Sequence, residues 1–277
     1  MHSLFKLCAV CCLTVICQIV FAQPEIRILT TEEPPTNYTE NGRLTGITTD
    51  VVMAIQQQIG SNTPIEVLPW ARAYRIASSE PNIIIFTAGK TQTRVDLGFH
   101  FIGPVVTRSH ILIGRSSDNL GIKVLDDVKT QNLEIGAMRG DWREKFFSDQ
   151  GFKLQSATDH YVVLKMLAAG RIPLAISSDL EAPAVARKLN LPVHTFKPVY
   201  EFDHAASYIL FSKGTSPKIV DQWQQAFLDL QTTDFFFRTA ANWTNILGLQ
   251  VQYNKIQGFF VSHQFESQKK VSTQQME

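Results

Sequence analysis

The stretch VLPWARAYRIASSEPNIIIFTAGKTQTRVDLGFHFIGP (residues 67–104) combines a helical pattern, an apolar run and a polar turn. The apolar run Ile83–Phe86 predicts a buried β-strand, which leads directly into the small-residue turn 87–89. Thr91 and Arg94 follow this turn. Hydroxyls, a glycine and a fixed cation at the end of a strand favour an anion-binding corner. From these residues alone, a core strand followed by a surface loop with solvated arginines is the alternative.

Residues 1–22 differ from the rest of the 277-residue chain, because Lys6 precedes an apolar run that ends at the small residue Ala22. This pattern predicts a secretory signal peptide, and it is too short to favour a membrane-spanning helix. All cysteines lie inside it, so the mature chain is predicted to lack disulfides, thiolate nucleophiles and cysteine-ligated metal. Export without disulfides suggests the bacterial periplasm. The cysteines are Cys8, Cys11, Cys12 and Cys17.

Composition and motifs exclude several classes of function. The chain has 26 lysines and arginines against 25 aspartates and glutamates, and no basic stripe, so no nucleic-acid partner is predicted. There is no Gly-x-Ser-x-Gly elbow, no phosphate-cradling Gly-x-x-x-x-Gly-Lys loop and no His-Glu-x-x-His motif. The histidines are scattered without metal-ligand spacing. We therefore predict neither a cofactor nor a metal, and we expect a protein that is not an enzyme.

Strand and helix patterns alternate at the spacing of parallel sheets covered by helices on both faces, which predicts an α/β fold. A helix begins at Asp50, and a second set of strands and helices starts near residue 112. A single long helix is predicted over Ile219–Ala240, with its Phe235–Phe237 triplet in the core. The main predicted strands are 25–30, 65–68, 83–86, 109–115, 133–137, 174–177 and 207–211.

Polar groups follow three of these strands, at Thr87–Arg94, at Gly140-Asp141 and at Ser178-Asp179. In doubly wound sheets, ligands bind outside the carboxyl ends of the strands. Two such sheets that face one another would form a cleft, and a ligand in it would contact both lobes.

Three segments carry a resemblance to a known family: PWARAY through FIGP (69–104), IGAMRGDW (135–142) and AAGRIPLAISSD (168–179). In this order the chain resembles the family-3 extracellular solute-binding proteins of bacterial amino-acid ABC transporters, and within them a subgroup common in proteobacteria. The resemblance covers about residues 25–250. It implies a two-lobed type II periplasmic-binding fold, in which each lobe has a mostly parallel sheet flanked by helices and two crossing strands join the lobes.

The resemblance also implies roles for individual residues. Arg94 matches the arginine that pairs with a ligand α-carboxylate, for which a guanidinium has the best geometry. Thr87 and Gly89 match the residues that complete that carboxylate site. Asp179 matches the acid that holds the ligand α-ammonium, and Trp70 matches an aromatic that stacks on the ligand. Further candidates for ligand contact are Thr91, Tyr38 and Arg72.

Three acidic residues depart from the family pattern. Asp141 stands where the family usually has Thr or Ser, and it either caps the following helix or faces the cleft. Glu32 and Glu33 lie near the position of the family's first aromatic contact, where they are either solvated or recognise a cation. If they face the cleft, these acids predict a ligand with more positive charge than a neutral amino acid.

The resulting prediction is a monomeric periplasmic receptor that closes on a small zwitterion and delivers it to the membrane permease of an ABC transporter. The hinge is predicted near 108–112 and 202–206. A ligand-sensing partner of a signalling protein is the alternative, and a cyclohexadienyl-dehydratase-like enzyme using Glu181 or Asp141 is a third class. The predicted parts are a signal peptide (1–22), lobe 1 (23–110 and 205–254), lobe 2 (111–204) and a polar tail (255–277).

Overall fold

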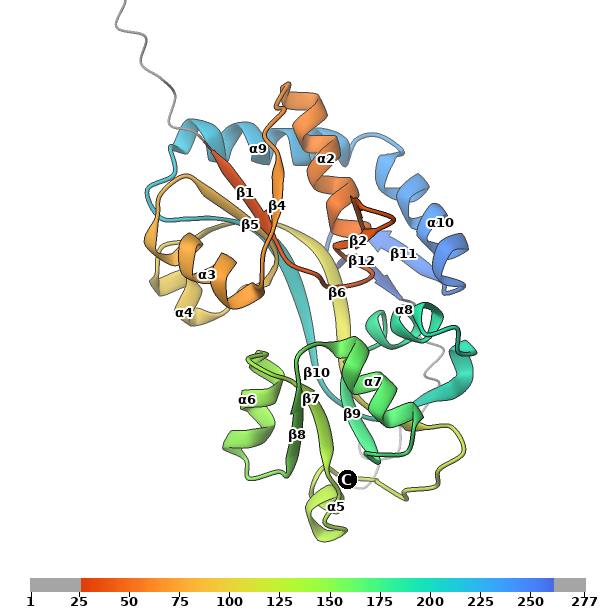
Figure 1. Cartoon of the computed structure of the whole chain (residues 1–277). Helices are drawn as coiled ribbons and strands as arrows, with labels where there is room; N and C mark the ends of the chain where they lie inside the picture. Colours follow the sequence, from red (N-terminus) through yellow and green to blue (C-terminus); the bar gives the residue numbers. More distant parts are fainter. Residues whose placement is uncertain (1–25, 262–277) are drawn as a thin grey trace, which may run out of the picture.

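The computed structural model describes residues 26–261, which fold into two α/β lobes joined by two long strands (Figure 1). The segment assigned to a signal peptide lies outside these residues, as does the polar segment 262–277. Within the described part of the chain, no helix is both long and apolar enough to cross a bilayer. The predicted α/β class is confirmed.

The first lobe is built on three neighbouring parallel strands with helices on both faces. Its elements are β1 (Arg27–Thr30), β2 (Tyr38–Glu40), β3 (Arg43–Thr45), α2 (Ile47–Ile59), β4 (Ile65–Val67), α3 (Trp70–Ser79), β5 (Ile83–Gly89) and α4 (Gln92–Asp96). Successive residues of β1 point to opposite faces. Ile28 therefore packs with α2, and Leu29 packs with α3.

The second lobe repeats this arrangement, with β7 between β8 and β9 in a parallel sheet. Its elements are α5 (Asp126–Thr130), β7 (Ile135–Met138), α6 (Trp142–Asp149), β8 (Leu154–Ala157), α7 (His160–Ala168), β9 (Leu174–Ser178), α8 (Glu181–Lys188) and the 3-10 turn Val193–Thr195. Ala175 packs toward α7 and α8, and Ile176 packs toward α6. Strand β8 was not predicted, because LQSA lacks an apolar run.

Two long antiparallel strands, β6 (His100–Arg115) and β10 (Phe196–Phe211), run through both lobes (Figure 1). The second half of β10 pairs with β5 in the first lobe, and the second half of β6 pairs with β9 in the second lobe. The strands predicted at 109–115 and 207–211 are the carboxyl halves of these longer strands. At the predicted hinge, Ser109 pairs with His204 and His110 pairs with Asp203.

The carboxyl-terminal region returns to the first lobe as α9 (Pro217–Leu230), α10 (Phe235–Leu247), β11 (Val251–Asn254) and β12 (Gly258–Val261). The single helix predicted over 219–240 is wrong. The chain breaks after Leu230, where the Thr232 and Thr233 hydroxyls donate to the Asp229 and Leu230 carbonyls of the last turn. Phe236 is buried as predicted, but Phe237 is 65% exposed, so it is not part of the core.

Residues 258–261 form a strand, although the sequence placed them in a polar tail starting at 255. Strand β12 pairs with β11, and its Phe259 pairs with Val106 of β6. The run GFFV is short, but it buries Phe259 completely in the first-lobe core. The first lobe therefore includes the residues up to Val261.

The start of α8 adds an apolar contact between the lobes to the crossing strands. Leu180 lies between β9 and α8 of the second lobe, yet it is fully buried within the core cluster of the first lobe. Ala184, one turn further along α8, packs against the same cluster. Leu180 therefore holds the start of α8 against the first lobe.

Candidate functional site

The loop after β1 is fixed by buried polar side chains rather than by a core of its own. Asn37 is fully buried, and its Nδ2 donates to the Thr31 carbonyl at 2.5 Å. The Thr36 carbonyl accepts the amides of Thr48 and Thr49, which are among the orphan donors of the first turn of α2. This loop carries Glu33 toward the strand ends.

Thr87 joins the end of β5 to the same loop. Its φ of +65° is unusual for a β-branched residue and costs about 1–3 kcal/mol. The hydroxyl of Thr87 donates to Asn37 Oδ1 in a buried contact. The strained turn thus sets the direction of the chain that leads into Gly89 and Arg94.

Arg94 lies at the carboxyl end of β5, in helix α4. The Thr91 side chain caps this helix by accepting the Arg94 amide at 3.4 Å. The guanidinium donates from Nη1 to the Gly89 carbonyl at 2.5 Å and lies 5.3 Å from the Trp70 ring and 5.1 Å from the Tyr74 ring. Burial lowers the pKa of Arg94. Among residues 26–261, no carboxylate lies within ion-pair distance of it.

Helix α3 supplies the aromatic surface beneath Arg94. Trp70 and Tyr74 are four residues apart, so they lie on one face of the helix, where their rings stack at 5.4 Å. Tyr74 stacks in turn on Phe99 at 6.2 Å. Arg72, on another face of α3, is exposed, and its charge acts on Glu66 at the edge of the sheet. The structure therefore brings Trp70 to Arg94 but does not bring Arg72 there.

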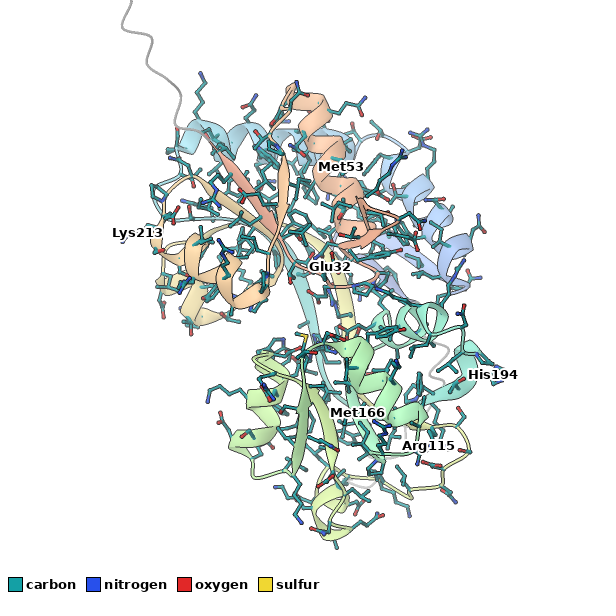
Figure 2. All side chains as sticks on the ribbon, viewed as in Figure 1. Glu32, Met53, Arg115, Met166, His194 and Lys213 are labelled. Carbon is teal, nitrogen blue, oxygen red and sulfur yellow. The ribbon has the colours of Figure 1, made fainter. Side chains whose placement is uncertain are left out.

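Tyr38 lies apart from this group. It packs edge-on against Trp243 at 6.4 Å, beside the first-lobe core, and burial raises its pKa. Glu32 is exposed, and its carboxylate accepts the amide and the hydroxyl of Thr39 at 2.9 and 2.6 Å. Figure 2 places Glu32 at the edge of the first lobe nearest the second lobe.

Glu33 is paired with Arg108, a residue of β6 that is only 4% exposed. Burial raises the pKa of the Glu33 carboxyl, and the Arg108 guanidinium opposes this effect. The charges of Arg143, Glu181 and Asp141, across the junction between the lobes, also affect the pKa of Glu33. The structure therefore brings the first-lobe loop and the second-lobe strand ends into one electrostatic network.

The second-lobe part of this network is a buried cluster around Arg143. Asp141 caps α6 by accepting the Arg143 amide at 2.9 Å, and it binds Arg143 Nη2 at 2.5 Å. Arg143 Nη1 also binds Glu181 at 2.9 Å, and His160 Nε2 lies 3.1 Å from the same carboxylate. Asp141 is therefore a helix cap, as the first of its two interpretations has it, and it is also ion-paired with Arg143.

The charges of this cluster shift its carboxyl pKa values strongly. Burial alone would raise the pKa of Glu181, but Arg143, followed by His160, holds it down to about 2. Burial likewise opposes ionisation of Asp141, and Arg143 again outweighs it, leaving the pKa of Asp141 well below its ordinary value. Both groups are therefore carboxylates at neutral pH.

Asp179 is buried at the carboxyl end of β9, near the crossing strands. Its amide donates to the Ser109 carbonyl of β6 at 3.1 Å, and its Oδ1 accepts the Leu180 amide at 2.8 Å. Predicted charged residues thus lie in both lobes, Arg94 in the first and Asp179 in the second, at the strand ends where ligands bind in such sheets.

The sequence interpretation missed Arg108, Arg143, His110, His160 and Trp142. One signal was available: Arg108 interrupts the apolar run of VVTRSHILIG, and a charge inside a buried strand requires a partner.

In the described part of the chain, no three His, Cys, Asp or Glu side chains form a group that could hold a metal. The surface hollow lined by Glu144, Ser148 and Phe152 lies between α6 and β8, and none of the predicted site residues lines it.

Two of the three acids are ion-paired within the protein: Glu33 is bound to Arg108, and Asp141 is bound to Arg143. These two pairs offset the negative charge that suggested a ligand with additional positive charge. Glu32 is exposed and accepts hydrogen bonds from Thr39, which do not neutralise its carboxylate.

Several solved structures share this architecture. A histidine kinase sensor domain with similarity to periplasmic binding proteins has a TM-score of 0.70 at 15% identity, over 80% of this chain and 96% of that one. An ancestral arginine-binding protein bound to arginine has a TM-score of 0.68 at 19% identity, over 80% and 99%. The substrate binding protein of an amino acid ABC transporter has a TM-score of 0.67 at 16% identity, over 80% and 100%. The likeness confirms the predicted two-lobed type II periplasmic-binding fold.

No curated protein matches this sequence. The family model for bacterial extracellular solute-binding proteins, family 3, matches residues 26–246, which is nearly all of the described chain and begins where the structure begins. The match spans both lobes and the crossing strands. The chain belongs to the bacterial extracellular solute-binding proteins, family 3.

Proposed function

We propose that this protein is a receptor for a small zwitterion of the amino-acid class, bound between the two lobes. The observation that carries the proposal is Arg94, a half-buried guanidinium on an aromatic surface at the end of β5. No carboxylate of residues 26–261 lies within ion-pair distance of it. A charge that is partly removed from water is stabilised by an opposite charge, and a ligand carboxylate would supply one.

In this proposal, Thr87 and Gly89 shape the carboxylate site and Asp179 binds the ligand ammonium from the other lobe. Because the ligand would contact both lobes only when they are close together, its binding energy favours the closed form. The hinge would be the paired segment around Ser109 and His204 on the crossing strands. Closure requires no covalent chemistry.

Binding can be measured by thermal shift and calorimetry against the common amino acids, polyamines and small carboxylates. Arg94→Ala is expected to weaken a ligand by about 100-fold, because it removes charge-assisted hydrogen bonds. Arg72→Ala is the matched control, since this arginine of the neighbouring helix is exposed, and it is expected to leave affinity unchanged. An Arg94→Ala protein that binds as tightly as the wild type would refute the proposal.

The closed receptor would then deliver its ligand to the membrane permease of an ABC transporter. The proteins of this family are extracellular, which supports export of this protein from the cytoplasm. Fractionation of cells that express the full chain tests a periplasmic location. The receptor is expected to be a monomer on gel filtration with and without ligand. Co-purification with a permease only in the presence of ligand would support delivery.

A ligand-sensing role is the second candidate, and the similarity to a histidine kinase sensor domain favours it. Both roles would use the same binding residues. They differ in partner, so crosslinking in cells followed by capture of the chain separates them. Recovery of a signalling receptor instead of a permease would identify the sensing role.

A dehydratase-like activity is disfavoured because its two candidate acids, Glu181 and Asp141, are both ionised and bound to Arg143. Glu181 is held as a carboxylate by Arg143, with a pKa of about 2, so it has no proton to donate at neutral pH. Asp141 is bound to the same arginine. Incubation with prephenate or arogenate is expected to yield no product.

A further inference from the structure

Trp142 is an exposed aromatic residue in a position that packing within its own lobe does not explain. Its side chain is 47% exposed, whereas Trp223 and Trp243 are core residues at 3% and 1%. It begins helix α6 at the carboxyl end of β7, so it lies at the edge of the second lobe that carries the other strand-end residues. Its chain neighbours Asp141 and Arg143 are both buried in the charged cluster, which fixes the backbone from which the indole projects.

Trp142 is the outer end of a row of rings that leads into the second-lobe core. Its ring meets His110 edge-on at 5.0 Å, and His110 lies 6.2 Å from Phe202. Phe202 stacks on Phe146 at 5.6 Å and meets Phe147 at 4.8 Å. The row therefore gives Trp142 a rigid aromatic support, while one part of its indole stays open to a further ring.

His110 makes this surface uncharged. The imidazole is 6% exposed, and its Nδ1 is buried without a hydrogen-bond partner in the described part of the chain. Burial, then the charges of Arg143 and Arg108, lowers the pKa of His110 to about 2, and Glu181 and Asp141 only partly oppose this. The imidazole is therefore neutral at neutral pH, and it supports Trp142 as an uncharged ring.

We propose that Trp142, supported by His110 and Phe202, recognises an uncharged aromatic side chain of the bound zwitterion. This inference rests on the proposed function and names its ligand class: an amino acid with a planar π side chain, rather than a basic or a small aliphatic one. The first lobe matches this chemistry, since Arg94 stands on the stacked rings of Trp70 and Tyr74. Aromatic pairs add favourable energy beyond the area they bury, which gives the aromatic ligand its advantage.

The test compares L-phenylalanine, L-arginine and L-alanine by calorimetry on the purified chain. L-phenylalanine is expected to bind about tenfold more tightly than the other two. Trp142→Ala is expected to remove this preference while leaving the affinity for L-alanine within about twofold, and Trp142→Phe is expected to retain most of it. Phe237→Ala is the matched control, because Phe237 is an exposed ring on the first lobe.

Intrinsic fluorescence provides a second readout. Ligand stacking on Trp142 excludes water from a half-exposed indole, so L-phenylalanine is expected to shift the emission to shorter wavelength in the wild type. The shift is expected to be lost in Trp142→Phe. A ligand that binds in an Arg94-dependent way without aromatic preference, or a preference that survives in Trp142→Ala, overturns this inference and leaves the proposed function intact. Failure of every amino acid to bind overturns both.

Discussion

At the scale of single residues, the junction between the lobes is governed by arginines that neutralise buried acids. Arg143 binds Asp141 and Glu181, and Arg108 binds Glu33. Burying ions costs free energy, and this cost is offset only when each ion is well paired. Arg94 differs from these two arginines, since it contacts the Gly89 carbonyl and the rings of Trp70 and Tyr74, and no carboxylate of residues 26–261 lies within ion-pair distance of it. This difference is why we assign the ligand carboxylate to Arg94.

The pH dependence of stability tests the Arg143 cluster. The folded-state pKa of Glu181, about 2, lies below its ordinary value of 4.5, so the carboxylate stabilises the fold above about pH 4.5. This contribution is lost as the pH falls toward 2. Glu181→Gln lacks the titrating group. The difference in unfolding free energy between wild type and variant is therefore expected to be largest at pH 6–7, at about 2–4 kcal/mol, and to shrink toward pH 2.

Urea denaturation at a series of pH values measures this difference. Glu134→Gln serves as the control, because Glu134 is an exposed carboxylate of the same lobe. A difference between wild type and Glu181→Gln that stays constant from pH 7 to pH 2 would show that the charge of Glu181 contributes nothing through Arg143.

At the scale of secondary-structure elements, the first turn of α2 and the loop after β1 are packed backbone to backbone. Gly46 precedes α2 with a φ of +132°, and a Cβ there would lie 2.3 Å from the Thr36 carbonyl oxygen. The loop and the helix start can approach this closely only because position 46 has no side chain. This approach positions Asn37, and through it Thr87.

Gly46→Ala is expected to destabilise the protein by more than about 2 kcal/mol, because backbone atoms must move to admit the methyl group. Gly42→Ala is the matched control. It also has a positive φ, of +76°, in the β2–β3 turn but no atom within 4 Å of the added Cβ, so about 1 kcal/mol is expected. Thermal or urea denaturation gives both values. Equal losses for the two variants would contradict the role assigned to the close approach.

At the scale of the whole molecule, two lobes with separate cores are joined by continuous strands and by an apolar contact at the start of α8. Strands β6 and β10 carry the sheet from one lobe to the other (Figure 1). Leu180 places a second-lobe side chain within the first-lobe core. The lobes are therefore coupled near the crossing strands, while Trp142 and the Trp70–Tyr74 surface belong to different lobes.

Leu180→Ala is expected to lower the free energy of unfolding by about 2–5 kcal/mol, the usual cost of a cavity at a fully buried leucine. Because Leu180 joins the two cores, the variant is also expected to unfold less cooperatively. Tryptophan fluorescence reports mainly the first-lobe core through Trp223 and Trp243, and circular dichroism reports both lobes. Leu97→Ala, at a 40% exposed position, is the control. A loss no larger than that of Leu97→Ala would contradict the coupling.

The sequence by itself determined the α/β class, most strands and the placement of Arg94, Thr87, Gly89 and Asp179 at strand ends, because apolar periodicity and turn residues are local signals. It did not show that β6 and β10 are long, since polar residues such as Thr107 and Arg108 interrupt their apolar pattern. It also could not show where α9 ends and α10 begins.

Only the tertiary structure determines which charged side chains form ion pairs. Glu33 and Arg108 are 75 residues apart, and Arg143 and Glu181 are 38 apart, so no local pattern pairs them. The pairs of Glu33 with Arg108 and of Asp141 with Arg143 offset the negative charge that suggested a cationic ligand. The row from Trp142 through His110 to Phe202 likewise joins three separate segments. Ion pairing and ring contact depend on distance in space, which the order of residues along the chain does not contain.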